Sequence, residues 1–236
     1  MTTAVSDARQ NAGGAAAHDG AMALDSVSLG SAPLGAPDLD RPVLGSPAVD
    51  TTIDDTAAVD TTGPLLAAVL PSPAGALAVL LTPDGVVRAA GFAPVATMLA
   101  RLPLDLAVRG HELVDARELL ARGGAVAVVA ESAARYADGE VRALDAVAVA
   151  QPGGPFQQRA WVAMRAIAPG TTATYAELAV AAGSPAAVRA AGSACARNLV
   201  APFVPCHRVL RSGGTLGGYY YGLEAKQVLL AHESRG

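Results

Sequence analysis

The residues best able to do chemistry lie near the end of the chain, in Pro205–Val209. Here one of only two cysteines, Cys206, directly precedes one of only four histidines, His207. A thiol attacks as its thiolate, and a nearby imidazole commonly lowers the thiol pKa. The proline before the pair disfavours a helix and predicts an extended or turning loop. The pattern indicates a nucleophilic cysteine. The alternative is a buried structural cysteine beside a chance histidine, since free cysteine is among the most buried residue types.

The charge of the chain is divided unevenly along its length. The whole chain has a net charge of −4, which argues weakly against a nucleic-acid partner. Residues 155–236, however, contain eight basic and three acidic residues, a net charge of +5, so residues 1–154 carry −9. Such asymmetry points to an anionic partner for the basic part, although ordinary surface solvation would give the same count.

The composition bounds the class of protein. With 236 residues, 52% of them hydrophobic, the chain can form one large domain or two small ones. No apolar run is long enough to span a bilayer, and the N-terminus lacks the pattern of a secretory signal. Two cysteines do not make a disulfide framework. We therefore expect a cytoplasmic protein with no membrane partner.

The sequence divides into four segments and predicts an α+β fold. Residues 1–62 contain no aromatic residue and are rich in small, polar and acidic residues, which predicts a disordered acidic tail. Residues 63–150 are expected to form a small N-terminal sheet-and-helix domain, and residues 151–154 a linker. Residues 155–236 are expected to form a mostly helical C-terminal domain.

Apolar runs separated by turn residues predict the elements of the N-terminal domain. Turns are expected at residues 71–75 and 83–85, and the glycine pair Gly123-Gly124 separates two helices. The expected strands are Leu65–Leu70, Ala76–Thr82, Val86–Phe92 and Asp145–Ala150, and the expected helices are Val95–Leu102, Arg117–Arg122 and Ala125–Ala137.

The C-terminal domain is expected to contain a helix-turn-helix. Its first helix, residues 156–167, carries an apolar stripe that core packing explains. Two helices then follow, Thr174–Ala182 and Ala186–Arg197, joined by a turn at residues 183–185. Alanine and glycine make the last helix slim, so it can pack closely against protein or enter a nucleic-acid groove. Arg189 and Arg197 favour the DNA interpretation, although such helix pairs also occur in many enzymes.

The motifs of the C-terminal domain, taken together, resemble the O6-alkylguanine-DNA alkyltransferases, the methylated-DNA–protein-cysteine methyltransferases of the bacterial Ogt and Ada C-terminal type. The resemblance extends from Phe156 to Glu233. The matching stretches are Phe156-Gln-Gln, Pro169-Gly170, Thr174-Tyr175, Gly183-Ser-Pro185, Val188-Arg189-Ala190, Ala194-Cys-Ala-Arg-Asn198, Pro205-Cys-His-Arg-Val209, Gly217-Gly-Tyr219, Gly222-Leu223, Lys226 and Leu229-Leu-Ala-His-Glu233.

The resemblance implies four catalytic residues. Cys206 would accept the alkyl group, and His207 with Glu233 would activate it through a water between the thiol and the imidazole. A water fits an extended backbone, in which neighbouring side chains point to opposite sides. Tyr175 would hydrogen-bond the flipped guanine and help to protonate it as it leaves.

The resemblance also implies a DNA interface and a pocket. Arg189 would fill the gap that a flipped base leaves in the stack, which offsets part of the unstacking cost. Asn198 would hold the turn after the recognition helix, Tyr219 would wall the pocket, and Lys226 would fix its loop. The DNA-binding residues would be Arg189, Ala190, Ser193 and Arg197, and the pocket and its support would comprise Asn198, Val209, Tyr219, Tyr220 and Lys226.

The implied function is DNA repair by a monomer on double-stranded DNA containing O6-alkylguanine, with O4-alkylthymine as a further candidate. The alkyl group would pass irreversibly to Cys206 in a single turnover. The damaged base is itself the alkyl donor, so no cofactor is expected, and no glycine fingerprint of a dinucleotide site is present. No metal is expected either, because no cysteine precedes Cys195. Cys195 is expected to be a buried apolar residue.

The sequence departs from the family pattern at Tyr220 and Tyr221, where relatives have other residues, and this leaves the accepted alkyl size open. Two other functions are considered. A non-catalytic sensor of alkylated DNA would lack the acceptor cysteine, and Cys206 is present. A cysteine hydrolase needs an oxyanion hole and a base that is usually distant in sequence, which an adjacent Cys-His pair does not indicate.

Overall fold

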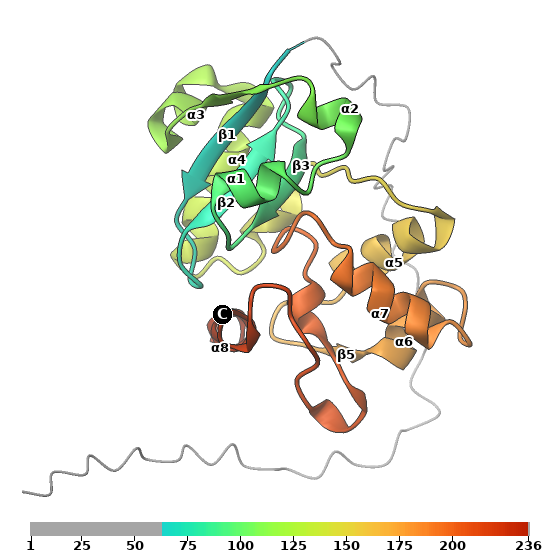
Figure 1. The fold of residues 1–236 in the computed structure, drawn as a ribbon. Coiled ribbons are helices and arrows are strands. Elements are labelled where there is room, and N and C mark those ends of the chain that lie inside the picture. Colours follow the sequence, from blue (N-terminus) through green and yellow to red (C-terminus); the bar gives the residue numbers. More distant parts are fainter. Residues whose placement is uncertain (1–62, 236) are drawn as a thin grey trace, which may run out of the picture. The chain divides into compact units, whose positions relative to one another are not determined.

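The computed structural model describes residues 63–235 (Figure 1). The predicted tail, residues 1–62, lies outside the described residues. No helix within residues 63–235 is long and apolar enough to cross a membrane. The described chain combines a four-stranded sheet with surrounding helices and a mostly helical C-terminal part, so the predicted α+β class is confirmed.

A four-stranded sheet forms the N-terminal part. Strands β1 (Leu65–Leu70), β2 (Leu77–Leu81) and β3 (Val87–Gly91) pair antiparallel, and β4 (His111–Leu113) pairs parallel with β1, giving the order β3-β2-β1-β4. The turn between β2 and β3 contains Gly85 at φ 88°, where a side chain would also strike the backbone of α4.

Helices cover both faces of this sheet (Figure 1). The helices α1 (Val95–Leu99) and α2 (Leu104–Ala107) pack on one face through Met98 and Leu106. The helices α3 (Ala116–Arg122) and α4 (Gly124–Ala137) pack on the other. Burial on both faces explains why β1 and β2 are continuous apolar runs rather than alternating ones.

The C-terminal part begins at α5 (Pro155–Arg165), which has proline in its first turn. Trp161 of α5 donates its indole N–H to the Ala194 carbonyl at 3.0 Å and so fixes α5 against α7 (Val188–Ala196). The short strands β5 (Ala173–Thr174) and β6 (Val209–Leu210) pair parallel, and helix α8 (Leu223–Glu233) ends the described fold.

The predicted helix-turn-helix is present as α6 (Tyr175–Ala181) and α7. Thr174 caps α6 by accepting from the Glu177 N–H, and the Glu177 carboxylate accepts from the Thr174 N–H. The turn contains Gly183 at φ 73°, and Ser184 to Ala187 form a further turn before α7 begins.

Several expectations about elements are wrong. The segment 145–150 is not a strand: the short 3₁₀ helix η1 (Ala143–Ala146) is followed by a single bridge between Val149 and Val87. The helix expected over Val95–Leu102 ends at Leu99, and the chain continues to Leu102 as turns, in which the Arg101 and Leu102 N–H groups donate to carbonyls three residues earlier. The helices α2 and α8 and the strands β4, β5 and β6 were not predicted.

Candidate active site

The predicted nucleophile lies in a fully buried stretch of chain. Every residue from Val200 to Leu210 is buried, and Cys206 is 7% exposed. Of the two expected conformations the turning one is observed, because Cys206–Arg208 form a single turn of 3₁₀ helix, η2. Pro205 stands directly before this helix, where its missing N–H costs no hydrogen bond. The backbone at Cys206 and His207 is therefore not extended, so the two side chains need not point to opposite sides.

The side-chain amide of Asn198 holds the turn around Cys206. Its Nδ2 donates to the Val204 carbonyl at 2.7 Å and to Cys206 Sγ at 3.2 Å. Its Oδ1 accepts from the Val200 N–H and from Gln151 Nε2, both at 3.1 Å. The buried amide is thus bonded through both of its ends.

A buried ionic cluster adjoins the thiol. Glu233 Oε1 lies 3.0 Å from His207 Nε2 and accepts from the Tyr136 hydroxyl at 2.8 Å. Arg208 donates Nε to Oε2 at 2.8 Å and Nη2 to Oε1 at 2.9 Å, a bidentate pair. The His207 side chain is 0% exposed and that of Glu233 is 1% exposed, so this charge is well desolvated.

The cluster fixes the charge state of each member. Burial raises the pKa of Glu233, but hydrogen bonds from His207 and Arg208 lower it to about 2, so the carboxylate is ionised. Burial lowers the pKa of His207 despite Glu233, which favours neutral imidazole. An ionised Glu233 can only accept at this contact, so His207 carries its proton on Nε2 and donates it to Oε1, and Nδ1 is left as an acceptor. Nδ1 is buried and has no hydrogen-bond partner within residues 63–235.

Burial also governs the acceptor thiol. It raises the pKa of Cys206, and the hydrogen bond from Asn198 and the nearby Lys226 partly oppose the rise. The resting group is therefore a thiol that needs a base to react as a nucleophile, and a neutral imidazole, that of His207, follows it directly in the chain. Lys226 is itself fully buried and donates Nζ to the Val209 carbonyl at 2.7 Å, so it holds the strand that follows η2.

Tyr175 stands at the first position of α6, where the Thr174 cap fixes the start of the helix. Burial raises the pKa of Tyr175, so its hydroxyl keeps its proton. A Cβ on Gly217 would lie 2.6 Å from this hydroxyl oxygen. Glycine at 217 therefore allows Tyr175 to approach the loop that precedes Tyr219.

Arg101 connects the loop that contains Tyr220 and Tyr221 to the N-terminal part. Arg101 Nη1 donates to the Tyr221 hydroxyl at 2.9 Å, Nη2 donates to the Asn198 carbonyl at 3.2 Å, and the guanidinium lies 4.0 Å from the centre of the Tyr220 ring. The Tyr221 hydroxyl donates to the Ala90 carbonyl at 3.2 Å. Tyr220 itself is 58% exposed, whereas Tyr219 is partly buried.

The predicted DNA-binding residues lie on α7 and at its end. Arg189, Ser193 and Arg197 are four residues apart and all exposed, so they share one side of the helix. Ala190 is partly buried, and the buried Ala191 and Ala194 face the core. The slim helix thus presents an exposed stripe with an arginine at each end.

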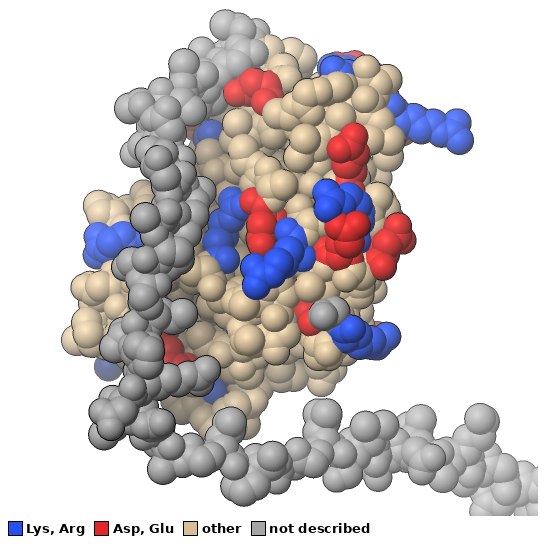
Figure 2. All heavy atoms as spheres, turned by 180° about the vertical axis from the view of Figure 1, so that it is seen from behind, with Lys and Arg blue, Asp and Glu red and all other residues tan. Residues whose placement is uncertain are grey.

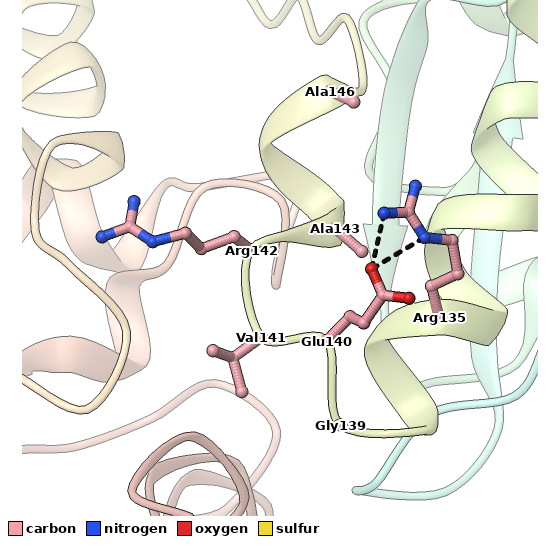
Figure 3. Close-up of a pocket in the computed structure, with 7 residues that line it drawn as sticks. All are labelled: Arg135, Gly139, Glu140, Val141, Arg142, Ala143 and Ala146. Atoms are coloured by element: carbon pink, nitrogen blue, oxygen red, sulfur yellow. Dashed lines mark hydrogen bonds and ion pairs between the residues drawn. The ribbon is translucent and has the colours of Figure 1, made fainter. Parts of the chain in front are cut away.

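Other surfaces offer less chemistry. A hollow of about 330 Å³ lies around η1, and in Figure 3 the Arg135 guanidinium in it is paired with Glu140 while Arg142 points away. On the face seen in Figure 2, basic and acidic side chains lie interspersed, as expected of a solvated surface. The described residues contain no group of three or more histidine, cysteine or acidic residues placed to hold a metal.

The structure brings Cys206, His207, Asn198 and Glu233 together and adds residues that sequence reasoning missed. Arg208 stands inside the Pro205–Val209 motif, and the need to neutralise a buried glutamate could have identified it. Tyr136, Gln151 and Arg101 give no such signal, because they come from distant parts of the chain. Cys195, expected to be buried, is only partly buried and packs against the core.

Several known proteins match parts of this chain. Residues 155–235 match the family model described as 6-O-methylguanine DNA methyltransferase, DNA binding domain. The chain is 51% identical over 82 residues to the bifunctional transcriptional activator/DNA repair enzyme Ada of Escherichia coli, a match to 35% of this chain and 23% of Ada. It also spans only 61% of some other relatives that it matches.

Two comparisons cover both parts of the fold. The methylated-DNA–protein-cysteine methyltransferase of Mycolicibacterium paratuberculosis is 38% identical over 154 residues, 65% of this chain and 89% of that protein. The structure of Mycobacterium tuberculosis OGT in complex with DNA has a TM-score of 0.53 and 25% identity, over 72% of this chain and 93% of that one. The buried Cys206 site therefore stands in a chain that belongs to the methylated-DNA–protein-cysteine methyltransferase family.

Proposed function

We propose that this protein repairs DNA by transferring the alkyl group of O6-alkylguanine to Cys206, once per molecule. The observation that carries the proposal is the setting of the sulfur. Cys206 Sγ accepts from Asn198 at 3.2 Å, and the neighbouring His207 is held by Glu233 at 3.0 Å. The names of the relatives support the same activity.

The chemistry begins with removal of the thiol proton. Neutral His207 takes it at Nδ1 through a bridging water, and Glu233 stabilises the resulting imidazolium. The thiolate then attacks the alkyl carbon in line with the O6–carbon bond. A sulfur–carbon bond forms, the carbon–oxygen bond breaks, and its electron pair stays on the guanine. The thioether product is not reversed by water at neutral pH, so the protein acts once.

The leaving guanine needs a proton, since neutral guanine leaves more readily than its anion. Tyr175 is the donor in this proposal, because its hydroxyl is protonated and reaches toward Gly217 at the pocket loop. Tyr219, Tyr220 and Val209 contribute the wall of the pocket, and Lys226 keeps that wall in place through the Val209 carbonyl.

The duplex docks on α7, with the exposed Arg189, Ser193 and Arg197 toward the DNA. The guanine must leave the stack to reach a buried thiol, and Arg189 fills the space that it vacates. The damaged base supplies the alkyl group, so the reaction calls for no separate methyl donor. The proposal describes a monomer acting on double-stranded DNA in the cytoplasm.

Incubation with DNA carrying a radiolabelled O6-methylguanine tests this function. We expect label to become stably bound to the protein and to map to the peptide containing Cys206. Cys195→Ala serves as a matched control that keeps the acceptor and should take up label as the parent does. Binding of the DNA without transfer would indicate a damage sensor. The absence of both binding and transfer would overturn the assignment to DNA altogether.

A further inference from the structure

Gln151 lies in the segment between η1 and α5, 47 positions before Asn198, which its side chain contacts. It is only 7% exposed. Its Nε2 donates to Asn198 Oδ1 at 3.1 Å, and its Oε1 accepts from the Leu199 N–H at 2.7 Å. The Gln158 side chain donates to its carbonyl at 2.9 Å. A residue expected to lie in a plain linker is therefore built into the support of the acceptor site.

The bond from Gln151 selects one of two orientations of the Asn198 amide. With two donors, Gln151 Nε2 and the Val200 N–H, facing one end, that end must be the oxygen. The NH₂ end then faces the Val204 carbonyl and Cys206 Sγ. A reversed amide would set donor against donor and would leave the sulfur facing an oxygen.

The orientation matters to the sulfur because a hydrogen bond to a thiolate favours the charged form. We infer that Gln151 is a positioning residue for alkyl transfer: it fixes the Asn198 amide with its NH₂ toward Cys206 and thereby sets the reactivity of the thiol. The inference rests on the proposed function only in taking Cys206 as the acceptor. Gln151 does not touch the sulfur, and its effect passes through Asn198.

Gln151→Glu is the sharpest test, since it keeps the size of the side chain and the acceptor for the Leu199 N–H. The new carboxylate oxygen faces Asn198 Oδ1, acceptor against acceptor. This repulsion displaces the amide from the position in which the Val200 N–H and the Val204 carbonyl hold it and weakens the bond from Nδ2 to the sulfur. Gln157→Glu is the matched control: it makes the same change six positions away, and its oxygen still accepts from the Gly154 N–H.

The measurement is the pH profile of Cys206 alkylation by iodoacetamide, followed by mass spectrometry of the Cys206 peptide, with folding checked by urea unfolding. We expect the midpoint for Gln151→Glu to rise by about one pH unit, and Gln157→Glu to keep the parent profile. Gln151→Met removes the polar contacts without adding charge and should shift the midpoint less, in the same direction. In an Asn198→Ala background neither change should add to the shift.

An unchanged profile in folded Gln151→Glu and Gln151→Met protein would overturn the inference, as would an undiminished shift in the Asn198→Ala background. Because iodoacetamide needs no DNA, this result stands apart from the labelled-DNA test. Failure of methyl transfer with a shifted thiol profile would refute the proposed function and leave the role of Gln151 intact.

Discussion

At the scale of single residues, the site depends on how a buried carboxylate is satisfied. Glu233 accepts hydrogen bonds from Tyr136 of α4 and from the neighbouring His207 and Arg208 of η2, two separate parts of the chain. A buried charge is tolerated only when it is paired and hydrogen-bonded in this way. The consequence for chemistry is indirect: the ionised carboxylate fixes which nitrogen of His207 carries the proton and which one can accept another.

Replacement of Cys206 by serine or alanine should abolish alkyl transfer and leave DNA binding within about twofold of the parent, because α7 rather than the thiol meets the duplex. A serine hydroxyl is far less nucleophilic near neutral pH. Single-turnover transfer and equilibrium binding to the same methylated duplex measure the two properties. Transfer by the serine variant would show that the acceptor lies elsewhere.

The contribution of Glu233 to the stability of the fold should decrease at acid pH. Its pKa is lowered to about 2 in the folded protein, below the unfolded value near 4.3. Such a group stabilises the fold fully above the unfolded pKa and loses the contribution as the pH falls toward 2. Glu233→Gln should therefore cost a few kcal/mol at pH 7, since it leaves Arg208 poorly paired.

Urea unfolding of the parent and Glu233→Gln at pH 7, 5 and 3 measures this difference. We expect the gap in unfolding free energy to be constant between pH 7 and 5 and smaller at pH 3. A gap that widens as the pH falls would contradict the low pKa of the folded state.

At the scale of elements, the slim helix α7 packs against the core with one side and exposes the other. Ala191 and Ala194 are buried, and Trp161 bonds to the Ala194 carbonyl, so the position of the helix is fixed from inside. Because the helix is fixed, Arg189 on its exposed stripe is held at a fixed position relative to the core. Small residues on the buried side allow close packing against the core, and the arginines lie on the exposed side.

Arg189→Ala should slow repair of duplex DNA at least tenfold more than transfer from free O6-methylguanine base, because opening the stack costs a few kcal/mol and the free base has no stack. Arg189→Lys should recover little, since an ammonium cannot replace a planar guanidinium. If Arg189 only contacts a phosphate, lysine will restore most of the activity and the salt dependence of binding will change. Rates on both substrates at two salt concentrations distinguish these cases.

The sequence predicted the elements with strong local patterns and missed those without. The first three strands and the helices α3 to α7 were expected near their observed bounds, since apolar runs and turn residues mark them. Strand β4 has three exposed residues and pairs only with β1, so it has no apolar pattern to detect. The contacts of Gln151 and Tyr136 were not predictable, because only the tertiary fold brings residues 47 and 97 positions apart together.

At the scale of the whole described chain, the N-terminal part helps to build the site. Tyr136 of α4 bonds to Glu233, Arg101 reaches Tyr221 and Asn198, and the Ala90 N–H donates to the Leu199 carbonyl at 2.7 Å. Through these hydrogen bonds the sheet-and-helix part helps to hold the Cys206 site in place, in addition to folding around its own core.

Tyr136→Phe tests that support. Loss of one hydrogen bond to a buried carboxylate should reduce the unfolding free energy by about 1.5–3 kcal/mol and slow alkyl transfer, while DNA binding stays unchanged. Tyr220→Phe, which alters an exposed tyrosine, is the stability control. Equal unfolding free energies for Tyr136→Phe and the parent would show that the hydroxyl contributes nothing to the cluster.

Deletion of residues 1–60 should leave folding and alkyl transfer nearly unchanged. The sheet, the helices and every contact of the candidate site described above lie within residues 63–235. The deleted segment contains nine aspartates against two arginines, so its removal takes away negative charge and should tighten DNA binding slightly at low salt.

Deletion of residues 1–70 is the contrasting variant, because it removes β1, which lies between β2 and β4, and should prevent folding. Thermal unfolding, transfer from methylated DNA and binding at two salt concentrations compare the three chains. Loss of folded, active protein on removal of residues 1–60 would mean that this segment contributes to the fold, and binding unaffected by salt would remove the electrostatic part of the prediction.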